Sequence, residues 1–155
     1  MVGIVDDQWT GVILAAGRGS RMKSRLPKVL HKLCGKELIK YPVELMHELK
    51  ISNIVIIVSA ENCSEIKKTL GDGFNYIIQP EPRGTGDALE CALPMISGSE
   101  HQILVMNGDV PLLRANSVAN LCVSHMDNSA SMSLLTVVDV IGQDLGIVDR
   151  DANFR

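Results

Sequence analysis

Three positively charged side chains lie on or just after a glycine-rich segment near the start of the chain. An apolar run from Gly11 leads into Gly17-Arg-Gly-Ser-Arg21, and Lys28 follows shortly after. Glycine lets a backbone turn and approach a ligand closely, because no Cβ intervenes. Backbone amides next to cations suit a polyphosphate. Arg18, Arg21 and Lys28 therefore indicate a phosphate-binding turn, and the alternative is an ordinary tight turn with surface charges.

Two common phosphate-binding motifs fit this segment poorly. A dinucleotide-binding fingerprint requires a third glycine where Met22 stands. It also requires an acidic residue at the end of the second strand, where Ser59 and Ala60 stand. No Gly-Lys-Ser/Thr sequence follows the turn, so the segment is not a Walker loop either.

Asp109 is the candidate metal ligand. It follows the apolar run 103–106 and precedes Val110-Pro111, and the proline forces an extended exit from the strand. A carboxylate at this place can hold Mg²⁺, a hard cation that takes oxygen ligands and shares them with phosphates. The alternative is an aspartate that caps the following loop.

Groups suited to recognising a base lie in the segment 79–86. Gln79 ends an apolar run, and its amide can donate to one base atom and accept from another. Gly84-Thr85-Gly86 opens a predicted helix and offers backbone amides. A solvated turn with an N-cap threonine is the alternative. The four histidines are scattered, and none stands with a serine or cysteine in a recognisable nucleophile setting.

Strand and helix patterns alternate along the chain and would position these residues. Predicted strands cover residues 12–15, 54–58, 75–79, 103–106 and 132–138. Predicted helices cover residues 39–49, 64–70, 85–96 and 118–126, and Pro94 is expected to kink or end the third of them. This alternation predicts an α/β fold of three layers with a mostly parallel sheet. Ligands bind beyond the carboxyl ends of such strands, so we expect the glycine-rich turn, Gln79 and Asp109 to meet there.

The composition limits the possible partners. The chain has 155 residues, of which 46% are hydrophobic, and a net charge of −3, so a general nucleic-acid surface is not expected. No apolar run is long enough to span a bilayer, and residues 1–10 do not resemble a signal peptide. The four cysteines form no C-x-x-C pair, which favours free thiols in a reduced cytoplasm.

Motifs in a fixed order strengthen this interpretation. They are Leu14–Met22, Leu26–Lys36, Gln79–Ala88, Asn107–Leu112, Leu134–Val137 and Gly146–Val148. Together they resemble the nucleotide-sugar pyrophosphorylases, and most closely the uridylyltransferase domains of bacterial bifunctional enzymes that make UDP-N-acetylglucosamine. The short spacing between the first two motifs is specific, because related thymidylyl- and guanylyltransferases usually carry a Leu-x-Pro insertion there. The resemblance covers about residues 10–150.

The resemblance implies a fold and a reaction. It implies a Rossmann-like nucleotide-diphospho-sugar transferase fold over residues 10–155, incomplete at its C-terminus, after a flexible tail at 1–9. The implied reaction joins UTP and N-acetylglucosamine-1-phosphate, with Mg²⁺ as cofactor, and releases pyrophosphate. Its product would serve peptidoglycan and lipopolysaccharide synthesis in the cytoplasm.

The resemblance also implies roles for single residues. The implied substrate-binding residues are Leu14, Ala15, Ala16, Gly17, Lys28, Gln79, Gly84, Thr85, Asn107, Gly108, Asp109 and Gly146. The implied catalytic residues are Arg18, Arg21 and Lys28. In these roles Gln79 pairs with the uracil edge, Asp109 binds Mg²⁺ and Gly146 meets the sugar. The arginines offset charge on the leaving pyrophosphate, and Lys28 steadies the attacking and α-phosphates.

Two positions depart from the family pattern and leave base selectivity open. The family commonly has a second glutamine where this chain has Pro82, and often a histidine where it has Asp87. The family's further sugar- and metal-binding residues and its trimer-forming β-helix domain would follow Arg155, so we expect a monomer or weak oligomer. Two other functions remain open: a nucleotide-binding remnant without turnover, and a cytidylyltransferase of isoprenoid synthesis, which shares a similar loop.

Overall fold

A parallel sheet forms the centre of the molecule. The computed structural model describes residues 8–17, 19, 22–81, 83–96 and 101–136. Four strands lie in the order β5-β4-β1-β6, and every pairing between them is parallel. Their bounds are Trp9–Leu14 for β1, Asn53–Ser59 for β4, Asn75–Gln79 for β5 and Gln102–Asn107 for β6. This arrangement confirms the predicted α/β fold with a parallel sheet.

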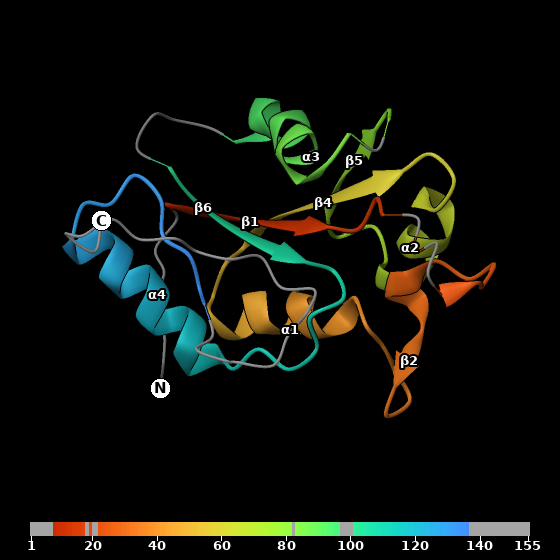
Figure 1. Ribbon diagram of the computed structural model, residues 1–155, viewed down its shortest axis with the longest axis horizontal. Coiled ribbons are helices and arrows are strands. Elements are labelled where there is room, and N and C mark those ends of the chain that lie inside the picture. The colour runs from red at the N-terminus through yellow and green to blue at the C-terminus, as the bar shows by residue number, and fades with distance from the viewer. Residues whose placement is uncertain (1–7, 18, 20–21, 82, 97–100, 137–155) are drawn as a thin grey trace.

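Helices cover both faces of this sheet. Three helices, α1 (Lys40–Glu48), α2 (Cys63–Leu70) and α4 (Ala115–Asp127), lie on one face. Helix α3 (Thr85–Ala92) lies on the other face (Figure 1). The predicted three layers are therefore present.

The core has one part on each side of the sheet, and the central strand β4 contributes to both. Ile56 and Val58 pack in the larger cluster with side chains of α1, α2 and α4. Val55 and Ile57 pack in the smaller cluster with Ala88 and Ala92 of α3. Because both faces are covered, β4 carries a continuous apolar run rather than an alternating one.

The strand order reverses next to β1. The chain runs from β1 outward to β4 and β5, and then returns to the other side of β1 as β6. In parallel sheets of this kind, the crevice beyond the carboxyl ends at such a reversal is the usual ligand-binding place. The residues that follow β1, β5 and β6 therefore converge on one region.

The structure bears on two further sequence predictions. The helix predicted at 85–96 ends as an α-helix at Ala92 and continues as a short 3₁₀ turn, η3 (Leu93–Met95), which agrees with the break expected at Pro94, a residue without an N–H for a helical hydrogen bond. The strand predicted at 132–138 was wrong over 132–136, which form no strand. Its apolar Met132 is 74% exposed, so neither burial of side chains nor hydrogen bonds to a neighbouring strand stabilise an extended strand there. Residues 137–138 lie outside the described ranges.

A small hairpin was not predicted. Strands β2 (Lys32–Leu33) and β3 (Lys36–Glu37) pair antiparallel around Cys34 and Gly35, whose φ angles are 50° and 84°. Positive φ at both central residues is the geometry of a tight type I′ turn. Strands of this length are too short to show an alternating pattern in the sequence.

No helix within the described ranges is long and apolar enough to cross a membrane.

Candidate functional site

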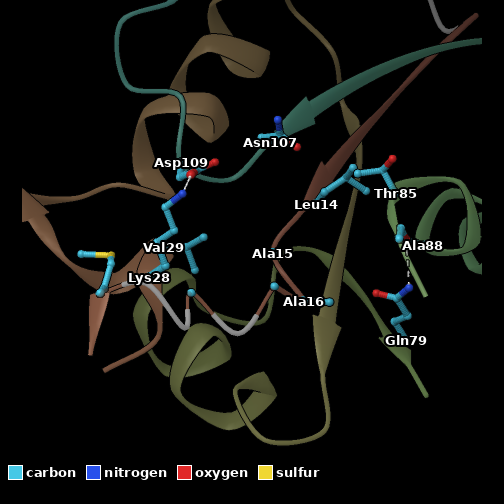
Figure 2. A pocket seen from close by; sticks show the side chains of 14 residues that line it. Leu14, Ala15, Ala16, Lys28, Val29, Gln79, Thr85, Ala88, Asn107 and Asp109 are labelled. Carbon is cyan, nitrogen blue, oxygen red and sulfur yellow. Dashed lines mark hydrogen bonds and ion pairs between the residues drawn. The ribbon is translucent and has the colours of Figure 1, made fainter. Parts of the chain in front are cut away.

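A cavity of about 540 Å³ opens at the carboxyl ends of the strands. Its lining residues are Leu14, Ala15, Ala16, Gly17, Gly19, Met22, Lys28, Val29, Gln79, Gly84, Thr85, Ala88, Asn107 and Asp109. The volume is in the range of small-molecule sites. Figure 2 shows Lys28 and Asp109 on one side of this space and Gln79 and Ala88 on the other, with the end of β1 between them.

The end of β1 is held in place by a buried asparagine. Asn62 is 5% exposed, and its Nδ2 donates to the carbonyl oxygen of Ala15 over 2.9 Å. Its Oδ1 accepts a hydrogen bond from the backbone N–H of Ser59, also over 2.9 Å. Asn62 is the residue immediately before α2, but its side chain does not cap that helix. It instead ties the end of β1 to the end of β4, which fixes the backbone that lines the cavity.

Gly19 allows the loop to pass close over Lys28. Its φ is 59°, and a Cβ built on it would lie 2.7 Å from the Cβ of Lys28. Any other residue would meet both the strained backbone angle and this close contact. Gly17 has neither restriction, since a Cβ there meets nothing within 4 Å. The conformational requirement that the sequence assigned to both glycines therefore belongs to Gly19.

Lys28 and Asp109 form an ion pair at the cavity wall. Lys28 begins the 3₁₀ turn η2 (Lys28–Leu30), and Asp109 follows β6. Gly108 allows the segment after β6 to lie close to η2 and to the end of β1. Its N–H donates to the carbonyl oxygen of Leu14 over 2.8 Å, and a Cβ on it would lie 3.0 Å from the side chain of Val29. Gly108 does not line the cavity itself but packs behind its wall. A cation and an anion thus share one end of the site.

The other end of the cavity is built by β5 and α3. Gln79 is 6% exposed, and its Nε2 donates to the carbonyl oxygen of Gly84 over 3.2 Å and to Oδ2 of Asp87 over 2.6 Å. Gly84 stands immediately before α3 with a φ of 117°, a conformation that favours glycine. Thr85 is the first residue of α3. These contacts orient the Gln79 amide.

The structure brings most of the sequence-assigned residues into one place. Ten of them line the cavity: Leu14, Ala15, Ala16, Gly17, Lys28, Gln79, Gly84, Thr85, Asn107 and Asp109. Arg18, Arg21 and Gly146 lie outside the described residues.

The lining residues that received no role from the sequence are Met22, Val29 and Ala88. Gly19 was expected to form the turn but was not among the assigned substrate-binding residues. The supporting residue Asn62 was missed as a part of the site, because its partner Ala15 is distant in sequence and no local signal identifies the contact. Asp87 was noted only as a departure from the family pattern that leaves base selectivity open, and its contact with Gln79 was not predicted.

Among the described residues that line the cavity, Asp109 is the one that carries a carboxylate. Over the described part of the chain, no three His, Cys, Asp or Glu side chains gather into a metal-binding group. Mg²⁺ is usually held by one or two carboxylates together with substrate phosphates and water. The donors present therefore fit a metal ion shared with a phosphate, rather than a metal enclosed by protein ligands.

Comparison with known proteins places this chain among nucleotide-handling domains. The MobA-like NTP transferase domain family matches residues 11–148. The Bifunctional protein GlmU of Clostridium perfringens strain SM101 is 38% identical over 127 residues, which cover 82% of this chain and 28% of the relative. The Bacillus subtilis strain 168 protein of the same name is 36% identical over 147 residues, which cover 95% of this chain and 32% of the relative. The chain thus spans less than a third of the length of these relatives.

Proposed function

The chain belongs to the MobA-like NTP transferase domain family, and on this premise we propose that it transfers a uridylyl group from UTP to N-acetylglucosamine-1-phosphate. The observation that carries the proposal is the division of the cavity into two ends. Lys28 and Asp109 suit a polyphosphate and its metal at one end, and Gln79 and Gly84 suit a base at the other. The motifs that resemble the uridylyltransferases support the choice of substrates.

The proposed reaction is a single in-line displacement. An oxygen of the sugar phosphate forms a bond to the α-phosphorus of UTP while the bond to the β-phosphate oxygen breaks, and pyrophosphate leaves with that electron pair. Two polyanions must approach each other, so the reaction depends on positioning and positive charge more than on a base or nucleophile. Lys28 would steady the attacking and α-phosphates. Arg18 and Arg21 would offset charge on pyrophosphate.

Asp109 would hold Mg²⁺, which when bound would polarise the phosphate oxygens. In the ion pair with Asp109, the Lys28 ammonium already lies at the cavity wall. A phosphate that enters can replace the carboxylate as the partner of Lys28, which frees Asp109 for the metal. We also propose that residues 10–155 act as one nucleotidyltransferase domain in the cytoplasm, in the synthesis of cell-wall precursors.

The experiment that tests the function is a pyrophosphate-release assay on this chain, with UTP, N-acetylglucosamine-1-phosphate and Mg²⁺. We expect turnover that stops when the metal is removed with a chelator. Binding of UTP without turnover would instead favour the nucleotide-binding alternative. Turnover with CTP rather than UTP would favour the cytidylyltransferase.

The variant Lys28→Ala tests the phosphate end of the site. Removal of one preorganised hydrogen-bond donor that faces the transition state costs about 10²–10³ in kcat, so we expect a loss of that order and a weaker affinity for UTP. Lys32→Ala is the matched control, because it removes the same charge four residues later from an exposed side chain paired with Glu37. Near-normal turnover and UTP affinity in Lys28→Ala would contradict the role of Lys28.

A further inference from the structure

We propose that Asp87 is a positioning residue that holds the Gln79 amide in one orientation and thereby selects the base. In that orientation Oε1 of Gln79 is presented to the ligand, and a base with a ring N–H at that edge is preferred. The inference rests on the proposed function, since it takes the base of a nucleotide to lie at the Gln79 end of the cavity.

Both hydrogens of the Gln79 amide are already engaged. Nε2 lies 2.6 Å from Oδ2 of Asp87 and 3.2 Å from the carbonyl oxygen of Gly84. Gln79 ends β5, while Gly84 and Asp87 stand just before and within the first turn of α3. The contacts therefore join the strand to the helix that follows it. Only 6% of Gln79 is exposed, so water can hardly replace these two hydrogen-bond partners of its amide.

The chemistry of the two partners allows only one orientation of the amide. A backbone carbonyl oxygen and an ionised carboxylate both accept hydrogen bonds and cannot donate them. Rotation of the amide by half a turn would place Oε1 against two acceptor oxygens, and both Nε2 hydrogen bonds would be lost. A buried polar group left without its partner costs more free energy than a typical hydrogen bond returns. Asp87 is the closer of the two acceptors, and together with the Gly84 carbonyl oxygen it gives the Gln79 amide one fixed direction.

The fixed orientation leaves an acceptor as the free atom. Figure 2 shows the nitrogen of Gln79 on the side turned toward Ala88 and its oxygen on the side turned toward Ala16. Both alanines line the cavity and offer no side-chain hydrogen-bonding group of their own. Oε1 is thus the atom of this amide available to a ligand.

A fixed acceptor distinguishes uracil from cytosine. Uracil carries a hydrogen on N3 and can donate it to Oε1. Neutral cytosine has no hydrogen on N3, so at the same place two acceptors would face each other. The sequence suggested that Gln79 could both donate to and accept from a base, but the contact with Asp87 leaves it only the accepting part.

The test compares UTP and CTP binding by isothermal titration calorimetry in the wild type, Asp87→Asn and Glu90→Gln. We expect the wild type to bind UTP about tenfold or more tightly than CTP, the ratio that one lost hydrogen bond at a buried group implies. Asparagine offers a donor as well as an acceptor, so Asp87→Asn removes one of the two acceptors that fix the amide and leaves only the weaker contact with the Gly84 carbonyl oxygen to oppose the reversed orientation. The ratio should therefore narrow to within about threefold. Glu90→Gln removes the same charge from an exposed position of the same helix and should keep the wild-type ratio.

Each outcome separates this inference from the function on which it rests. An unchanged UTP-to-CTP ratio in Asp87→Asn, or a wild type that binds both nucleotides equally, overturns the role of Asp87 and leaves nucleotide binding intact. A wild type that binds neither nucleotide overturns the proposed function itself. Asp87→Ser, whose hydroxyl also donates and accepts, replaces Asp87→Asn if the latter does not fold, and should narrow the ratio in the same way.

Discussion

Two neighbours, Gly19 and Asp109, hold the side chain of Lys28 in position. The glycine at position 19 leaves room for the loop to lie against its aliphatic stem, and the Asp109 carboxylate pairs with its ammonium group. A phosphate-binding lysine is useful only if its charge stays at the cavity wall, because a flexible side chain loses conformational entropy when it is fixed by the ligand. The glycine and the carboxylate reduce that loss before any ligand arrives.

The variant Gly19→Ala tests this arrangement. The added methyl group would meet the Cβ of Lys28 at 2.7 Å on a residue whose φ is 59°. We expect a loss of about 1–3 kcal/mol in the free energy of unfolding, from the strained backbone and the contact together. We also expect weaker UTP binding, because Lys28 must move. Denaturant unfolding and calorimetric titration measure the two effects.

The matched control is Gly17→Ala in the same loop, where the new methyl group meets nothing within 4 Å. Its stability should lie within about 0.5 kcal/mol of the wild type. Equal stability of the two variants would show that Gly19 is not required for the path of the chain over Lys28.

At the scale of elements, the β2–β3 hairpin and α1 are joined mainly by polar contacts. The hydroxyl of Tyr41 donates to the carbonyl oxygen of Leu33 over 2.7 Å. Glu37 in β3 lies 2.8 Å from the Nζ of Lys40 and 3.4 Å from that of Lys32. The hydrogen bond from Lys40, with a backbone hydrogen bond and then Lys32, lowers the pKa of Glu37 from 4.5 to about 2.

This lowered pKa predicts an acid-sensitive hairpin. The folded protein holds the Glu37 carboxylate more tightly than the unfolded chain, so its contribution to stability is complete above pH 4.5 and is lost as the pH falls toward 2. We expect a midpoint near pH 2 for the Glu37 carboxyl carbon in an NMR titration. Glu37→Gln should flatten the fall in the free energy of unfolding between those pH values.

Two controls accompany the titration. Glu48→Gln, at the exposed end of α1, removes one carboxylate without touching the hairpin and should leave that part of the pH dependence in place. High salt should weaken the effect of Glu37, because ion pairs near the surface are screened. A Glu37 midpoint at 4.5 would contradict the pairing with Lys40.

At the scale of the whole molecule, the layer of α1, α2 and α4 covers one face of the sheet and leaves the hairpin outside the core. Cys122 in α4 is 2% exposed and packs in the larger core cluster, whereas Cys34 is exposed in the hairpin turn. Burial raises the pKa of the Cys122 thiol to about 11. The reactivity of Cys122 therefore reports on the core beneath α4, and that of Cys34 reports on the exposed hairpin.

Thiol labelling at pH 8 followed by mass spectrometry tests this arrangement. Cys34 should react readily, while Cys122 should be protected until the protein unfolds, because it is both buried and protonated. Cys34→Ser should remove the label at position 34 and leave any label on the partly exposed Cys63 and Cys91. Rapid labelling of Cys122 in the native protein would mean that α4 does not lie on the sheet as described.

The sequence by itself determined the layers and the general location of the site. The continuous apolar run of β4 reflects burial on both faces of the sheet, which is nearly independent of the partner strand. The bounds of β5 were predicted and found at Asn75–Gln79, although only Gln79 is buried in that strand. Parallel strands share one carboxyl edge, so residues that follow β1, β5 and β6 had to converge. The local pattern of apolar residues therefore predicts the layers of the fold and the edge of the sheet at which the site lies.

Only the tertiary structure decided how the side chains pair within that site. The contacts of Lys28 with Asp109, of Asn62 with Ala15 and of Gln79 with Asp87 all depend on distances between segments that the chain brings together. Residues 132–136 likewise formed no strand, because a strand needs a hydrogen-bonding partner that no local pattern supplies. Hydrogen bonds and ion pairs act over a few ångströms and in fixed directions, so their partners follow from the folded geometry rather than from residue type alone.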